Sequence, residues 1–313
     1  MIMIFNKTTR YILPLAAAIA LVLPGCTGDE PYNGSKPLSD RDKQAANDVY
    51  VPQEAEKTPS FKADPLGWEI DSMAPGLIYY SFDDRDAFTG RYQSINVVEL
   101  DLCSSRYGLA LSYSETPALL SDVVRSESGL AGVNVVAETA AVNIRINGTT
   151  CDFPFVGPMW VTEAALCWND MDDLRMVAGG SNPQAYYNLC TERNLISGGR
   201  MLIAEGAVQS VPADDAAAHT VVALTADRDL LLVTVDAGNR YASGMTTREL
   251  ADWIAASFAP VSAFCLAGGD AVAMVVANHG DEATNIVNYP SSNGQADRSG
   301  EISVVSSLVI VNK

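Results

Sequence analysis

Residues 228–292 read RDLLLVTVDAGNRYASGMTTRELADWIAASFAPVSAFCLAGGDAVAMVVANHGDEATNIVNYPSS, and the order of patterns in this stretch decides the fold. The apolar run from Leu230 to Val235 ends at Asp236 and predicts a buried strand. After a Gly-Met turn, Thr246 and Glu249 have capping-box spacing, which marks the start of a helix. Four apolar residues share one face of that helix: Leu250, Trp253, Ile254 and Phe258.

Elsewhere in the chain, short runs rich in Val, Ile and Leu recur between turn residues and predict further strands. They are 77–82, 95–102, 131–136, 141–146, 201–204, 220–225, 261–266, 271–277 and 302–311. A second helix is expected over Pro117 to Val124, with Thr116 as its cap. We therefore predict an α+β fold with an extensive mixed or antiparallel sheet and a few packed helices.

Composition and charge exclude several function classes. The chain has 313 residues, 48% of them hydrophobic, with 20 basic and 38 acidic side chains, which gives a net charge of -18. A surface this acidic repels phosphates, so nucleic acid is not an expected partner. The sequence has no P-loop, zincin or nucleophile-elbow motif, and we expect no cofactor.

The N-terminus has the features of an export signal. Lys7 and Arg10 precede an apolar run from Tyr11 to Leu23, and Leu23-Pro24-Gly25-Cys26 follows. This ending resembles the lipobox of bacterial lipoproteins, in which the cysteine becomes the lipid-modified first residue. We expect residues 1–25 to be a signal peptide and Cys26 to carry the membrane anchor; the alternative is a plain secretory signal with an incidental cysteine.

Residues 26–64 are predicted to be the anchor and a flexible tether, because they are rich in Pro, Gly, Ser and charge. The domain is then expected to occupy 65–313. Asp29 and Glu30 resemble the acidic patch that directs some Bacteroidetes lipoproteins to the outer surface. We expect a lipid-anchored cell-envelope protein, in the outer membrane and facing either the periplasm or the surface; the sequence leaves the oligomeric state open.

Five cysteines remain after the anchor: Cys103, Cys151, Cys167, Cys190 and Cys265. An odd number leaves at least one thiol outside any disulfide within the chain. Their spacings match no zinc template, and only His219 and His279 are present to supplement them. A structural metal is therefore not expected. Cys265, in an apolar run, is interpreted as a small buried side chain.

The C-terminal third resembles the phosphodiester glycosidase family, which includes the enzyme that uncovers mannose 6-phosphate by removing N-acetylglucosamine. The similarity rests on a strand ending in Asp, a Gly-Met turn, a capped helix, a strand running into a Gly pair, an Asn-Tyr-Pro-Ser segment and a closing apolar strand. It covers about 75 to 313 and is strongest in the last 85 residues. The resemblance implies a sugar-phosphodiester ligand.

Carried over residue by residue, the resemblance implies a set of site positions. Asp236 is the carried-over candidate catalytic carboxylate, and Asp270, at the third Gly of the family's Gly run, is a second candidate; a carboxylate can act as acid, base or nucleophile at an anomeric carbon. The candidate substrate-binding positions are the carried-over Asn134, Gly244, Gly268, Gly269 and Asn288, together with His219, which replaces a family arginine. Gly-rich turns let backbone N–H groups approach phosphate, and Asn can bind sugar hydroxyls. Most of these positions also have a purely structural explanation, because turns and strand ends favour Gly and Asp.

The sequence departs from the family pattern where the chemistry would lie. The family's Asn-Leu-Asp-Gly-Gly-Gly-Ser core is Cys-Leu-Ala-Gly-Gly-Asp-Ala over residues 265–271, so that Ala267 replaces the motif's aspartate. An arginine of the family pattern is His219, which lacks the planar fork that grips phosphate. On an ideal strand Asp270 points opposite to Ala267, so it substitutes only if the Gly pair forms a turn.

Three functions follow from these observations. The favoured one is a divergent, catalytically impaired domain that still binds or acts on sugar-phosphodiester glycans. The alternatives are an active phosphodiester glycosidase and a non-catalytic surface protein that binds glycan or supports an assembly.

Replacing Cys26 with Ala should release a soluble or unprocessed protein, because the thiol that accepts the lipid is lost. Membrane fractionation and intact mass test this, with Cys103→Ser as the control. Unchanged fractionation and mass of the Cys26 variant would contradict lipidation.

Overall fold

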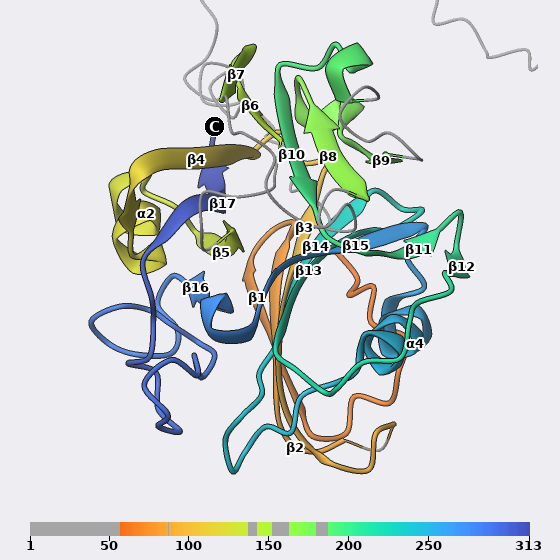
Figure 1. Cartoon of the computed structure of the whole chain (residues 1–313), viewed down its shortest axis with the longest axis vertical. Coiled ribbons are helices and arrows are strands. Elements are labelled where there is room, and N and C mark those ends of the chain that lie inside the picture. The colour runs from red at the N-terminus through yellow and green to blue at the C-terminus, as the bar shows by residue number, and fades with distance from the viewer. Residues whose placement is uncertain (1–56, 87, 137–142, 152–162, 180–186) are drawn as a thin grey trace, which may run out of the picture. The chain divides into compact units, whose positions relative to one another are not determined.

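The computed structural model describes residues 57–86, 88–136, 143–151, 163–179 and 187–313, all within one compact unit. The strands of these ranges form three sheets, and all of their pairs are antiparallel (Figure 1). The sequence predicted a mixed or antiparallel sheet, and the sheets of the described residues are antiparallel. Among the described residues, no helix is long and apolar enough to cross a bilayer. The predicted anchor, Cys26, lies outside them.

The eight-stranded sheet has the order β1 (Trp68–Ala74), β2 (Leu77–Arg85), β3 (Tyr92–Asp101), β14 (Asp229–Val235), β13 (His219–Leu224), β15 (Ser262–Gly268), β11 (Met201–Ala204) and β12 (Ala207–Val208). The five-stranded sheet has the order β7 (Thr149–Cys151), β6 (Ile144–Ile146), β10 (Asn194–Gly198), β8 (Ala164–Trp168) and β9 (Arg175–Ala178). The four-stranded sheet has the order β16 (Met274–Val276), β5 (Ala131–Val136), β17 (Val304–Asn312) and β4 (Tyr107–Ala118). Among the elements that lie wholly within the described residues, the helices are α2 (Leu120–Ser126) and α4 (Thr247–Phe258), with the 3-10 turns η2 (Met171–Asp173) and η3 (Gly269–Ala271).

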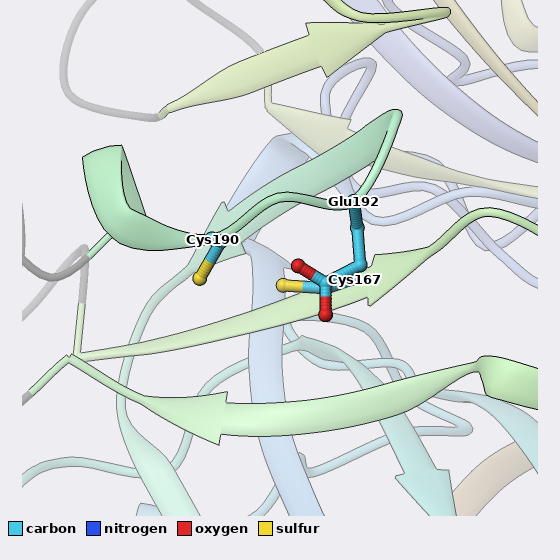
Figure 2. A group of neighbouring side chains, drawn as sticks. All are labelled: Cys167, Cys190 and Glu192. Carbon is cyan, nitrogen blue, oxygen red and sulfur yellow. The ribbon is translucent and has the colours of Figure 1, made fainter.

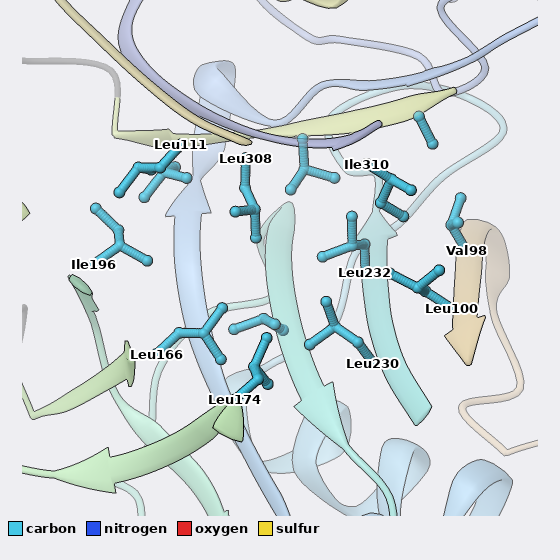
Figure 3. Close-up of a cluster of buried hydrophobic side chains, with 14 of the residues drawn as sticks. Val98, Leu100, Leu111, Leu166, Leu174, Ile196, Leu230, Leu232, Leu308 and Ile310 are labelled. Atoms are coloured by element: carbon cyan, nitrogen blue, oxygen red, sulfur yellow. The ribbon is translucent and has the colours of Figure 1, made fainter. Parts of the chain in front are cut away.

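The eight-stranded sheet has an apolar core on each face. In β14, Leu231 and Val233 belong to the cluster that packs against α4, whereas Leu230 and Leu232 belong to the opposite cluster. That second cluster includes side chains from β17, β8 and β10, as Figure 3 shows. Because alternate side chains of a strand point to opposite faces, a continuous apolar strand is the pattern that such two-sided burial requires.

Helix α4 confirms its predicted register. The hydroxyl of Thr246 accepts a hydrogen bond from the Glu249 N–H, and the Glu249 side chain accepts one from the Thr246 N–H. Leu250, Trp253 and Ile254 are buried against the sheet.

The structure corrects several predicted boundaries. The helix expected over Pro117 to Val124 begins only at Leu120, because β4 continues to Ala118, which still pairs with Val304. Thr116 is therefore not its cap. Of the strand expected over 271–277, only Met274–Val276 forms, because η3 occupies its start.

Residues at the end of the predicted tether pack on the domain. Lys57 forms ion pairs with Asp229 and Glu99, which are 1% and 0% exposed. The Ser60 hydroxyl donates to Glu99 at 2.8 Å or to Asp229 at 2.5 Å. Phe61 packs against the aromatic rings beside α4. Two buried carboxylates at the start of β14 and in β3 need a counter-charge, and the preceding segment supplies it.

Lys57→Met should lower the free energy of unfolding by roughly 3 kcal/mol, because two buried carboxylates lose their cation. Urea unfolding measures this, with the exposed Lys62→Met as the matched control. Equal small losses in both variants would show that Lys57 does not neutralise the pair.

Candidate functional site

Asp236 directly follows the fully buried strand β14. All seven residues of β14 are buried, and Asp236, which follows them, is 1% exposed. Its Oδ2 accepts hydrogen bonds from Ser94 Oγ at 2.9 Å and from the Tyr289 N–H at 2.8 Å. Its Oδ1 accepts one from Asn288 Nδ2 at 2.7 Å. The carboxylate therefore joins β3, β14 and the late Asn-Tyr-Pro segment.

Asn288 extends this junction to the strand after η3. Its Nδ2 also donates to the Val272 carbonyl at 3.2 Å, and its Oδ1 accepts from the Met274 N–H at 2.8 Å. Asn288 is fully buried. Both of its polar side-chain atoms thus bond within the protein in this structure.

Asn134, on β5, approaches the same segment from the four-stranded sheet. Its Nδ2 donates to the Ala271 carbonyl at 2.9 Å, while its buried Oδ1 has no hydrogen-bond partner. The structure thus brings Asn134, Asp236 and Asn288 together around residues 271–274.

The Gly pair ends β15 and starts η3. The ladder with β13 pairs Cys265 with Val221 and Gly268 with His219, so β15 has one extra residue at this point. Such a bulge redirects the strand. Gly269, at a φ of 60°, begins the turn, and the exposed Asp270 accepts a hydrogen bond from Ser291 Oγ at 2.7 Å. The turn required for Asp270 to replace the motif carboxylate is therefore present.

His219 and Gly244 hold the neighbouring turn. His219 Nε2 lies 2.7 Å from the Met245 carbonyl. Because a carbonyl only accepts, Nε2 carries the proton. Burial lowers the pKa of His219 below its ordinary value, which favours the neutral ring. Gly244 has a φ of 73°, and a Cβ there would lie 2.7 Å from the Ala217 oxygen, so this turn requires glycine.

An open pocket of about 720 Å³ begins two residues after Asp236. It is lined by residues 238–240, 242–243 and 294–297. A Cβ on Gly238 would lie 3.9 Å from the Ser291 Cβ, which places the pocket next to the Asp270–Ser291 hydrogen bond.

Sequence reasoning missed the side chains around this pocket. The guanidinium of Arg240 lies 4.5 Å from the Tyr241 ring centroid, and that of Arg298 lies 5.1 Å from the Tyr289 centroid. The two rings are 6.1 Å apart. The available signal was one Arg-Tyr pair, Arg240-Tyr241, in a turn segment of a very acidic chain; Arg298 and Tyr289 are too far apart in the sequence to suggest a contact. Guanidinium groups bind phosphate, and aromatic faces offer apolar surface to a sugar.

Residues 144–311, more than half of the chain, match the phosphodiester glycosidase (NAGPA) family. The chain belongs to this family. No curated protein matches the chain significantly.

Two solved structures share the fold of this phosphodiester glycosidase domain. A hypothetical protein from Synechocystis has 10% identity and a TM-score of 0.59, over 80% of this chain and 64% of that one, so the chain spans less than two thirds of that protein. The catalytic domain of zebrafish N-acetylglucosamine-1-phosphodiester alpha-N-acetylglucosaminidase, auto-inhibited by its pro-peptide, has 18% identity and a TM-score of 0.54, over 79% of this chain and 89% of that one.

Asp236 should make stability depend on pH. Burial raises its pKa from 3.8 to about 6, although hydrogen bonds from Asn288, Tyr289 and Ser94 act in the opposite direction. The folded state thus holds the proton more tightly than the unfolded state. This contribution is fully present below about pH 4 and is lost as pH rises through about 6, a change of about 3 kcal/mol.

Asp236→Asn should abolish that component, whereas the exposed Asp84→Asn should retain it. The free energy of unfolding at pH 4.5 and 7.5, compared between each variant and the wild type, measures the effect. A wild-type slope that persists in Asp236→Asn would assign the pH dependence to another group.

Proposed function

We propose that this domain binds a sugar phosphodiester in the open pocket and hydrolyses it slowly or not at all. We further propose that the chain is a bacterial cell-envelope lipoprotein, anchored in the outer membrane through Cys26. The lipobox-like sequence supports the anchor; the pocket and its neighbours support the ligand.

The observation that carries binding is the pair of arginines beside the pocket. Arg240 and Arg298 each lie over a tyrosine ring, in a chain whose net charge is -18. Arg240 lines the pocket directly. A guanidinium can hold a phosphodiester through two hydrogen bonds, while Tyr241 and Tyr289 provide apolar faces for the attached sugar.

The burial and the hydrogen bonds of Asp236 support impaired catalysis. Glycoside cleavage normally uses two carboxylates that reach opposite sides of the anomeric carbon. Asp236 is 1% exposed, and both of its oxygens already accept hydrogen bonds from the protein. With Ala267 at the family's motif aspartate, Asp270 is the exposed carboxylate that remains at this turn.

Asp270 also favours the second candidate, an active glycosidase. Its carboxylate lies on η3 beside Ser291, close to the pocket wall formed by Gly238. A single exposed carboxylate can act as a general acid or base, typically accelerating a reaction by about 10²–10⁴-fold.

An N-acetylglucosamine phosphodiester should bind to the wild type, and Arg240→Ala should weaken that binding by roughly tenfold to a hundredfold, because a charge-assisted hydrogen bond is lost. Calorimetric titration measures the affinity. Arg248→Ala is the matched control, since Arg248 pairs with Asp252 on the exposed side of α4.

Released sugar gives the hydrolysis rate in the same samples. Little turnover by the wild type, with Asp270→Asn unchanged, agrees with the proposal. Robust turnover that Asp270→Asn abolishes would establish the active glycosidase. Failure of the wild type to bind would leave the surface-assembly alternative.

A further inference from the structure

Cys167, Cys190 and Glu192 form a buried cluster in the five-stranded sheet (Figure 2). Their two sulfurs and one carboxylate oxygen all lie within 4.8 Å of one another. The residues are 0%, 8% and 7% exposed. Cys167 lies on β8, and the other two lie just before β10, so strand pairing brings them together.

Glu192 has one oxygen satisfied and one unsatisfied. Its Oε1 accepts from Arg175, at 2.6 Å from Nε and 2.5 Å from the terminal nitrogen. Its Oε2 is buried and has no hydrogen-bond partner. Leaving a charged oxygen without a partner in the protein interior is costly, so a ligand at this position would relieve the cost.

We propose that Cys167 Sγ, Cys190 Sγ and Glu192 bind one thiophilic divalent cation, Zn²⁺, with solvent as the fourth ligand. Tetrahedral zinc has Zn–S distances of about 2.3 Å, which place two sulfur ligands about 3.8 Å apart. The three ligand atoms already fall within 4.8 Å, so small side-chain movements complete the site. Paired thiolates also select zinc over magnesium or calcium.

The charges of the cluster balance on binding. Two thiolates and one carboxylate carry three negative charges, which Arg175 and a divalent cation neutralise together. In the reaction, two S–H bonds break, two Zn–S bonds form, and two protons leave to solvent.

A metal ion bound here would link three parts of the five-stranded sheet. It joins β8 through Cys167 to the segment before β10, while Arg175 connects β9 to Glu192. This is a structural role, separate from the pocket that residues 238–243 and 294–297 line.

Cobalt titration of the full chain under a phosphine reductant tests the site. One equivalent of Co²⁺ should produce a thiolate-to-cobalt charge-transfer band, and Zn²⁺ should displace it. Calorimetry in buffers of different ionisation enthalpy should report two protons released per ion. Binding should also raise the melting temperature.

Cys167→Ser and Cys190→Ser should each lose the band, and Glu192→Gln should weaken the affinity at least tenfold while keeping both thiolates. Cys103→Ser, at an exposed cysteine, should bind like the wild type. The glutamine variant keeps the test decisive if a serine variant fails to fold.

Two results would overturn the proposal. One is an unchanged band in the folded Cys167 or Cys190 variants, which would place the metal elsewhere. The other is no metal binding by the reduced wild type; if the oxidised protein then has a mass two hydrogens lower and resists alkylation at these positions, the cluster is a disulfide site instead.

Discussion

β14 runs through the centre of the eight-stranded sheet with every residue buried, and an aspartate lies at each end of it. A buried carboxylate is tolerated only when other groups satisfy it. At one end, Lys57 and Ser60 satisfy Asp229. At the other end, Ser94, Asn288 and the Tyr289 backbone satisfy Asp236. Segments far apart in the chain are thus held to the sheet by the same requirement.

At the Asp236 end, residues of the family pattern make contacts within the fold. Asn288 bonds to residues 272 and 274 as well as to Asp236, and Gly244 occupies a turn that has no room for a Cβ. These contacts are structural, whatever reaction occurs nearby. Ala267 lies in a bulge of β15, and Asp270 lies in the 3-10 turn that follows. The positions that depart from the family pattern thus lie around the end of β15.

The arginines of this protein lie in two different kinds of environment. The protein is strongly acidic, yet Arg240 and Arg298 lie over adjacent tyrosine rings beside the pocket. Stacking on a ring orients a guanidinium without neutralising it. The Cys167 cluster, in a different sheet, uses Arg175 in the opposite way, as a counter-charge to Glu192.

Elements whose signals are local follow from the amino-acid sequence alone. The apolar run of β14 and the capping box of α4 depend on neighbouring residues, and both have the predicted register. Family resemblance also selected Asn134, Asp236 and Asn288, which the structure brings together, although no local pattern could show that Asp236 is enclosed. Contacts between segments far apart in the chain became known only from the three-dimensional structure. Strand pairing extended β4 through Pro117, packing placed Lys57 on buried acids, and the β8–β10 ladder brought Cys167 near Cys190. The burial of a side chain and the pairing of strands depend on residues remote in the chain. Amino-acid composition and residue spacing therefore do not predict them.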